Sequence, residues 1–337
     1  MYSTHPGGVC HDWTSGWRAG RSWRLLLREI ERGGVGWRAT QYVVAMDLTA
    51  YLDESGIHSG ASHCALAGFI ASPRQWRLFD VAWHKALSVA PDLPVFHASD
   101  FFGRSGPYRS LPDATRLELI LGLCNAVTSH RLTPFGIIVD CEVFNRLSRD
   151  ARRFITGGTI LLDQSSRKWK WESSGAPNRP YFAVLNTALM LAANLAKPGK
   201  TVDFVFDQQE TFAPLVLSEF AKTKALALVD GSEKLGNCTF MDRKQTSALQ
   251  AADLLAHCWC TCYSAIIAGK EAFDKRGQLA QIAATERGKT LGEITRGNWW
   301  RDFSFQWFES EEALVLPIRR LSEDVARFLL EDRVEEP

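Results

Sequence analysis

Two adjacent carboxylates, Asp53 and Glu54, stand at the end of an apolar run, directly before Ser55 and Gly56. The run from 42 to 52 is rich in β-branched and aromatic residues, which predicts a strand that turns at the serine and glycine. A carboxylate at the exit of a buried strand can reach a cleft while the strand holds it rigidly. These two acids are therefore the first candidates for binding a cation.

Two further acids occur in comparable settings. Asp207 ends the apolar segment 202–207, and Asp253 lies inside an apolar helix predicted over 245–268. If the strands that carry Asp53 and Asp207 are neighbours, their carboxylates lie about 5 Å apart. Such a pair would repel and raise one pKa unless a cation lay between the two groups. The spacing suits a pair of Mg²⁺ ions roughly 4 Å apart, which would clamp the attacking and leaving oxygens of a phosphodiester.

The helix around Asp253 carries a polar stripe. At 100° per residue, Ser247, Gln250, Asp253 and His257 fall within an arc of roughly 120°. A polar stripe on so apolar a helix faces either a functional site or solvent. An ionised aspartate that is buried needs a partner or a metal, because burying it unpaired costs several kcal/mol. Gln250 and Ser55 are the candidates here for contacting a substrate.

Two other segments carry chemically useful side chains. His97, in the segment 96–100, could move a proton or contact a phosphate. The segment 146–179 is basic and carries tryptophans, and its residues Lys168, Trp169 and Lys170 could stack on and neutralise a nucleic-acid strand.

Each signal also has a purely structural interpretation. The acids at 53 and 54 could form only a turn, and Asp207 could cap the helix that follows it. Gln250 and Asp253 could lie on a hydrated surface. His97 could be a hydrogen-bonded core histidine, and the basic loop could be an exposed excursion.

The elements that must position these residues alternate between strands and helices. The predicted strands lie at about 42–53, 63–71, 95–97, 134–143, 201–207 and 238–241, the first two forming an antiparallel hairpin. The predicted helices lie at about 73–88, 113–129, 181–197, 213–228 and 245–268, with two weaker ones from about 311 and over 320–331. The segment 146–179 is expected to be irregular. This order predicts an α/β fold with a mixed sheet flanked by helices.

Bulk composition narrows the classes of function. The 337 residues carry a net charge of +1, so any nucleic-acid contact must be local to one groove or patch. No apolar run approaches the roughly 18 residues that a membrane span requires. Eight cysteines without framework spacing indicate reduced thiols and a cytoplasmic protein. Cys258, Cys260 and Cys262 alternate along the predicted helix, which disfavours a structural zinc site.

We expect three regions along the chain. Residues 1–45 are rich in tryptophan and arginine, and we interpret them as a disordered extension or as sequence preceding a natural start at Met46. Residues 46–270 form the main domain, with a basic insertion at about 146–180. Residues 271–337 form a small helical C-terminal region.

The order of these motifs resembles the domain-of-unknown-function family 3800, a bacterial and phage-associated group with an RNase H-like fold. The resemblance covers about residues 46–265. It rests on the segments 51–56 (YLDESG), 65–70 (ALAGFI), 96–100 (FHASD), 205–207 (VFD) and 247–256 (SALQAADLLA). The DESG and QxAD elements occurring together are fairly specific.

The resemblance implies an RNase H-like domain with an acidic site at Asp53, Asp207 and Asp253, and possible participation of Glu54. In RNase H-like enzymes such acids bind two Mg²⁺ or Mn²⁺ ions and hydrolyse phosphodiesters through a metal-activated water. We therefore expect a metal-dependent nuclease acting on RNA or DNA. The alternatives are a non-catalytic RNase H-like module that binds nucleic acid or protein, and a phosphoesterase for small phosphates.

Overall fold

The computed structural model describes residues 48–331, apart from 59, 94, 197–198, 209–211, 230–233, 268–303, 309–310 and 320–322. The chain divides into two units, Met1–Ala45 and Met46–Pro337, and the described residues belong to the second. The expectation for residues 1–45 therefore lies outside the described residues. None of the described helices is long and apolar enough to cross a membrane.

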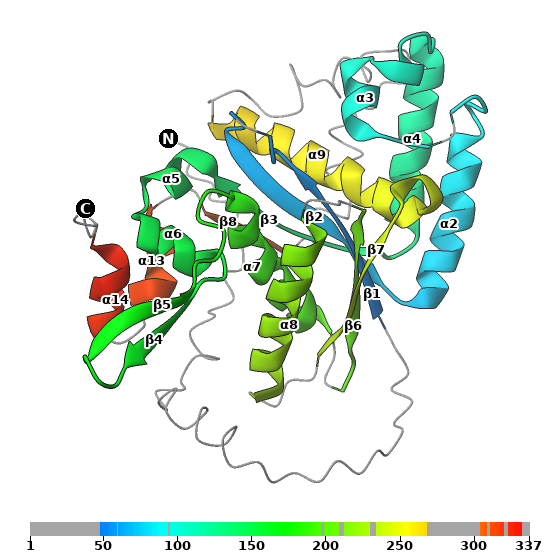
Figure 1. Ribbon diagram of the computed structural model, residues 1–337. Helices are drawn as coiled ribbons and strands as arrows, with labels where there is room; N and C mark the ends of the chain where they lie inside the picture. The colour runs from blue at the N-terminus through cyan, green and yellow to red at the C-terminus, as the bar shows by residue number, and fades with distance from the viewer. Residues whose placement is uncertain are drawn as a thin grey trace, which may run out of the picture. The chain divides into compact units, whose positions relative to one another are not determined.

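The described residues form a six-stranded sheet in the order β7-β6-β1-β2-β3-β8 (Figure 1). Its strands are β1 (Leu48–Ser55), β2 (His63–Ala71), β3 (Thr133–Asp140), β6 (Val202–Asp207), β7 (Leu235–Met241) and β8 (Ser304–Phe308). Neighbours among β1, β2 and β3 are antiparallel, whereas β6 runs parallel to β1, β7 to β6 and β8 to β3. The predicted α/β class with a mixed sheet is confirmed.

The predicted hairpin of the first two strands is also confirmed. Asp53 pairs with Ala67 in the antiparallel ladder of β1 and β2. Gly56 follows β1 with φ of 76°, and a Cβ at this position would lie only 2.0 Å from the carbonyl oxygen of His63. Only glycine combines this backbone conformation with so close an approach. The turn therefore fixes where β1 ends, and with it the place of the two adjacent acids.

Helices cover both faces of the sheet (Figure 1). On one face α9 (Ser247–Ile267) packs against β1 and β2, and α2 (Pro73–Leu87) contacts both α9 and α4 (Asp113–Ser129). On the other face α7 (Pro180–Leu195) packs against β2 and β3, and α8 (Ala213–Val229) lies against α7 and β7. These helices lie within a few residues of the predicted ranges.

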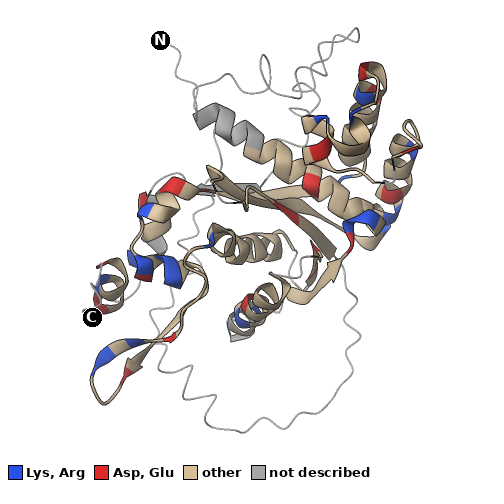
Figure 2. Cartoon of the chain, turned by 45° about the horizontal axis from the view of Figure 1, so that its top comes forward, with Lys and Arg blue, Asp and Glu red and all other residues tan. Residues whose placement is uncertain are grey.

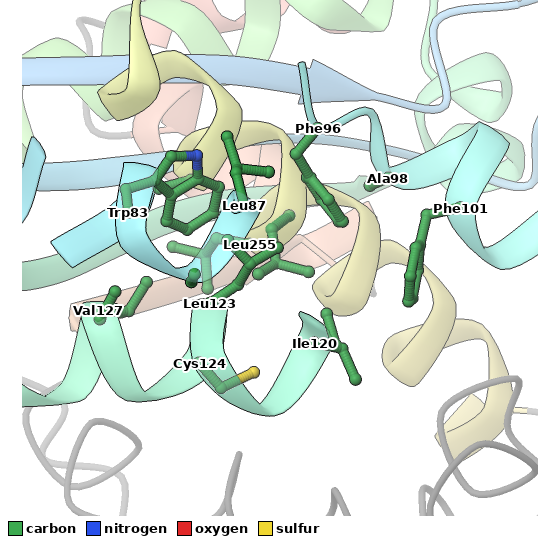
Figure 3. Packing of buried hydrophobic residues seen from close by; sticks show 14 of the residues in the cluster. Trp83, Leu87, Phe96, Ala98, Phe101, Ile120, Leu123, Cys124, Val127 and Leu255 are labelled. Atoms are coloured by element: carbon green, nitrogen blue, oxygen red, sulfur yellow. The ribbon is translucent and has the colours of Figure 1, made fainter. Parts of the chain in front are cut away.

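A buried hydrophobic cluster holds α2, α4 and α9 together. Trp83 of α2, Leu123 of α4 and Leu255 of α9 are each at most 1% exposed and converge on one interior, which Phe96 also enters (Figure 3). The predicted start of α2 is confirmed, because Ser72 caps it reciprocally with Gln75. This packing presses α9 onto β1, so the polar stripe of α9 is held against the end of that strand.

Two predictions about strands are wrong. Val95–His97 do not form a strand but lead into the short helix α3 (Ala98–Gly103). The strand predicted over 134–143 ends at Asp140, whose carboxylate accepts the backbone N–H groups of Glu142 and Val143 and so starts α5 (Cys141–Arg146). The aspartate cap outweighs the apolar run that continues past it.

The segment 146–179 is more regular than predicted. It contains α6 (Arg149–Ile155) and a separate two-stranded sheet of β4 (Thr159–Asp163) and β5 (Lys168–Ser173). Near the C-terminus, α13 (Glu311–Arg319) contacts α5, and α14 (Glu323–Leu330) contacts α6. Besides these two helices, the region expected to be helical contains β8, which joins the six-stranded sheet.

Candidate functional site

Asp207 ends β6, and Asp53 lies two residues before the end of the adjacent parallel strand β1. The ladder pairs Leu52 of β1 with Phe206 of β6, so the next residue in each strand is one of the two aspartates. Asp53 is 3% exposed, and Asp207 is partly buried. The condition set by the sequence, that these two strands be neighbours, is therefore met. Both aspartates lie at the same end of the sheet, where β1 and β6 finish.

Asp253 reaches this end of the sheet from α9. It is 7% exposed, and its Oδ2 accepts the backbone N–H of Ala98, at the start of α3, at 2.7 Å. The polar stripe on α9 thus faces the interior and not solvent over its first two turns. Ser247 at the start of the stripe donates to Asp80 of α2 at 2.5 Å.

The three aspartates surround one cation, the guanidinium of Arg243. Nη1 lies 3.9 Å from Asp53 Oδ2 and 3.8 Å from Asp253 Oδ2, and Nε lies 3.5 Å from Asp207 Oδ2. Arg243 opens the short 3₁₀ helix η3 (Arg243–Gln245) just after β7. Arg243 is not among the site residues predicted from the sequence. The available signal was a basic residue at the exit of a strand that runs parallel to β1 and β6.

Burial and mutual repulsion disturb the protonation of this cluster. The pKa of Asp53 is raised well above its usual value by burial first and then by the charges of Glu54 and Asp253, although Arg243 opposes the shift. Burial also raises the pKa of Asp253, against the bond from Ala98 and the charge of Arg243. Burial lowers the pKa of the Arg243 guanidinium, but the surrounding carboxylates raise it overall. Burial and the neighbouring carboxylates thus outweigh the guanidinium and disfavour the ionised forms of Asp53 and Asp253.

Glu54 is a fourth carboxylate, close enough to interact electrostatically with the three aspartates. Alternation along β1 directs it to the opposite face from Asp53, toward α7. Its charge accordingly raises the pKa of Tyr181 on α7, after the larger effect of burial. Burial, and then the charge of Asp207, raises the pKa of Glu54 itself to about 7.

His97 lies beside this cluster in a short hydrogen-bonded chain. Its Nδ1 donates to Asp100 Oδ2 at 2.6 Å, and its Nε2 lies 3.2 Å from the hydroxyl of Ser99. Asp100 also accepts the Ser105 hydroxyl at 2.6 Å, and these bonds to His97 and Ser105 lower its pKa. An ionised carboxylate can only accept, so Nδ1 is the donor in the pair with Asp100. The side chain is 31% exposed, so it is not an enclosed core histidine.

Gln250 is a buried brace among the elements of the site. Its Oε1 accepts the indole N–H of Trp83 and the backbone N–H of Phe96, both at 3.0 Å. Its Nε2 donates to the carbonyl of Arg243 at 3.0 Å. Only 3% of the residue is exposed. Gln250 thus uses these polar atoms within the protein, and its expected contact with substrate stays a prediction.

The remaining candidates lie apart from the acids or at their margin. Ser55 ends β1 and is hydrogen bonded to Cys260 of α9. Lys168, Trp169 and Lys170 lie on β5, in the two-stranded sheet, where Lys170 pairs with Asp163. Figure 2 shows lysine and arginine along this hairpin and on the short helices next to it. Their expected contact with nucleic acid would therefore be made outside the acidic site.

The donor set suits a hard divalent cation in type, since Mg²⁺ and Mn²⁺ prefer carboxylate oxygens. Within the described part of the chain, however, no group of three or more His, Cys, Asp or Glu side chains is arranged to hold a metal ion. The guanidinium lies among the carboxylates instead. Cys262, part of the disfavoured zinc interpretation, belongs to the residues whose side chains are not described.

Comparisons of the chain with protein-family models, with curated proteins and with solved structures find no match.

Proposed function

We propose that this protein is a metal-dependent phosphodiesterase acting on nucleic acid, with an RNase H-like domain related to the domain-of-unknown-function family 3800. One observation carries the proposal. Aspartates from three separate elements converge within 4 Å of a single cationic group, two of them buried and with raised pKa values. A protein gains no stability from burying like charges together, so such a cluster is typical of a functional site.

The fold supports the same proposal. The sheet is mixed and has helices on both faces, and Asp53 lies near the end of β1, a central strand. Asp207 ends the adjacent parallel strand, and Asp253 lies on the helix packed over them. An RNase H-like acidic site, as the resemblance implies, needs this arrangement of elements.

In this proposal Asp53, Asp207 and Asp253 would hold one or two Mg²⁺ or Mn²⁺ ions, and Glu54 would be a further ligand or would orient one. When bound, the metal would lower the pKa of a water molecule and balance charge on the phosphate. Ala98 donates its N–H to Asp253 and so fixes the direction of that carboxylate. Asp100 holds His97 through Nδ1, so Nε2 is the ring nitrogen that could accept a proton from the attacking water.

The test uses protein started at Met46 and its D53N/D207N variant. Each is incubated with end-labelled single-stranded RNA, single-stranded DNA, duplex DNA, RNA–DNA hybrid and mononucleotides, in Mn²⁺, Mg²⁺ or EDTA. Cleavage of a polymer by the parent protein, lost in EDTA and in the variant, would establish the nuclease and its substrate. Turnover of mononucleotides alone would assign a phosphoesterase of small phosphates.

The contacts of Arg243 favour a second candidate, the non-catalytic RNase H-like module. Its guanidinium already supplies positive charge to the three aspartates, so the cluster can persist without a metal. A ligand that binds only the folded state raises the melting temperature, so a metal site predicts stabilisation by Mn²⁺. An unchanged melting temperature in millimolar Mn²⁺, with no cleavage of any polymer, would favour the module.

A further inference from the structure

We infer that Ser99, His97 and Asp100 form a nucleophilic triad, in which the hydroxyl of Ser99 attacks neutral carboxylic esters. The inference goes beyond the proposed function, because it needs no metal and uses a serine in place of a water molecule as the nucleophile. His97 directly precedes α3, and the other two residues lie in its first turn.

The hydrogen bonds connect the three side chains in series. The hydroxyl of Ser99 lies 3.2 Å from His97 Nε2, and Nδ1 of the same ring donates to Asp100 Oδ2 at 2.6 Å. Since Nδ1 is the donor, Nε2 of the neutral ring has a lone pair and accepts from the hydroxyl. A base within about 2.6–3.2 Å of a hydroxyl, oriented in turn by a carboxylate, is the geometry that activates a serine nucleophile.

The surroundings of Asp100 keep it ionised. Its Oδ1 accepts the Ser105 hydroxyl at 2.6 Å, in addition to the bond that Oδ2 accepts from His97. These two bonds lower the pKa of Asp100, and the charge of Arg243 lowers it further. The carboxylate therefore orients the imidazole and stabilises the positive charge that the ring gains when it takes the proton of the serine.

The triad is accessible but lies on a firmly anchored segment. Ser99 is exposed, and the side chains of His97 and Asp100 are 31% and 40% exposed. On either side of the triad, Phe96 and Phe101 are fully buried, with ring centroids 5.4 Å apart (Figure 3). The buried rings hold the segment in place, while the reacting hydroxyl stays open to a substrate.

The reaction forms an acyl-serine and then hydrolyses it. Ser99 Oγ attacks the carbonyl carbon of the ester, and its proton passes to His97 Nε2. The bond between that carbon and the alcohol oxygen breaks, and the alcohol leaves with the proton from Nε2. Water then attacks the acyl group and gives a proton to Nε2. Ser99 Oγ leaves and takes that proton, which releases the carboxylic acid and restores the triad.

The surroundings favour a neutral ester over a phosphate. Ala98, between His97 and Ser99, donates its N–H to Asp253, so the triad lies beside the three aspartates. In the metal-free protein these carboxylates disfavour an anionic substrate. A carboxylic ester is neutral, and negative charge appears on its carbonyl oxygen only in the transition state. The charge of Arg243 acts on the triad and can stabilise that oxygen.

The first test needs no variant. The full chain is incubated in EDTA with a fluorophosphonate, which reacts covalently with activated serine, and peptide mass spectrometry measures the modification of Ser99. Ser129 is the internal reference, because it is also exposed but donates to the amide oxygen of Asn125, at 3.1 Å, and not to a base. The triad predicts that Ser99 is modified about 100-fold faster than Ser129. Equal rates at the two serines would overturn the inference.

The second test measures hydrolysis of p-nitrophenyl acetate, a neutral ester, in EDTA. The full-length proteins are wild type, S99A, H97Q, D100N and the control S129A, each checked for folding by circular dichroism. The rate above that of buffer should fall about 100-fold when the nucleophile, the base or the orienting carboxylate is removed, and S129A should match wild type. Undiminished hydrolysis by folded S99A or H97Q would contradict the triad.

Both assays separate this inference from the proposed function. They are run without free metal, so failure of the proposed metal site leaves their expected results unchanged. Conversely, an unreactive Ser99 would remove the triad and leave metal-dependent cleavage of nucleic acid to its own test.

Discussion

Asp53 is the most deeply buried carboxylate of the site, and every neighbouring acid raises its pKa. Ionised Asp53 is therefore tolerated in the folded chain only through Arg243 or a metal. Asparagine keeps its shape and removes its charge. The substitution should therefore reduce charge repulsion in the metal-free protein and reduce the activity of the metal-bound protein.

For D53N we expect a metal-free melting temperature equal to or above that of wild type. Loss of about 3 kcal/mol of transition-state stabilisation would reduce hydrolysis by about 100-fold or more. Thermal melts in EDTA and the polymer cleavage assay measure the two effects. D92N, which alters an exposed carboxylate, is the control. Full activity in D53N would remove Asp53 from the set of ligands.

Glu54 makes the stability of the metal-free protein depend on pH. Its pKa rises from the ordinary 4.5 to about 7 in the folded state, so between those values the folded chain binds more protons than the unfolded chain. Stability should therefore fall as pH rises from about 4.5 to about 7 and level off above, a loss of about 1–3 kcal/mol. Asp53 and Asp253 have raised pKa values and act in the same direction.

Urea unfolding in EDTA at several pH values between 5 and 8 measures this loss. E54Q has no carboxyl proton to release at this position, so its stability should fall less across the window than that of wild type. Mn²⁺ should reduce the loss in wild type. Identical pH dependence in E54Q and wild type would show that Glu54 does not titrate in this range.

At the scale of elements, Gln250 joins α9 to α2, to the 95–97 segment and to η3 through three hydrogen bonds, the first two of them buried. Q250L should leave the indole of Trp83, the N–H of Phe96 and the carbonyl of Arg243 without this partner. We expect a loss of about 2–4 kcal/mol in the free energy of unfolding, measured with urea. Q245L, at the exposed Gln245, is the matched control and should change stability little. Equal stability of the two variants would contradict the bracing role.

Local signals predicted most of these elements, and long-range contacts explain where they failed. Ser72 and Pro73 marked the start of α2 correctly, because a cap acts within one turn of helix. The apolar run 95–97 suggested a strand, in which backbone N–H groups bond to a neighbouring strand. Instead, the N–H groups of Phe96 and His97 donate to the side chains of Gln250 and Tyr108. The first of these partners is 154 residues away, and no local pattern reveals it.

The same distinction applies to the candidate site. The acids could be found because carboxylates at strand ends stand out against apolar runs, and the sheet register then brings Asp53 and Asp207 to one end of the sheet. Arg243 was missed because its role depends on β7 lying next to β6. Strand order is set by packing across the whole sheet, and the local pattern of one sequence does not reveal it.

For the whole molecule, the balance of 39 basic and 38 acidic side chains means that a polyanion must be attracted locally. The acidic end of the six-stranded sheet would repel a nucleic-acid backbone unless metal is bound. The β4–β5 sheet offers the opposite character. Lys168 is exposed on it beside the partly exposed Trp169, and Trp171 packs against Phe328 of α14, with ring centroids 6.0 Å apart. The hairpin is therefore anchored while its basic residues remain accessible.

If the β4–β5 sheet binds a nucleic-acid strand while the three aspartates cleave it, substitutions should affect binding and cleavage separately. K168A/W169A/K170A should weaken binding of a long single strand by about tenfold to a hundredfold, through loss of stacking and charge. It should also reduce the dependence of affinity on salt. Lys170 already pairs with Asp163, so Lys168 should contribute more of the charge effect. Fluorescence anisotropy at several salt concentrations measures both, with R77A/K85A on the exposed side of α2 as the control of equal charge.

Cleavage of a substrate too short to reach the hairpin should be unchanged, because the acids keep their geometry. Equal loss of affinity in the two variants would show that the hairpin contributes only general charge.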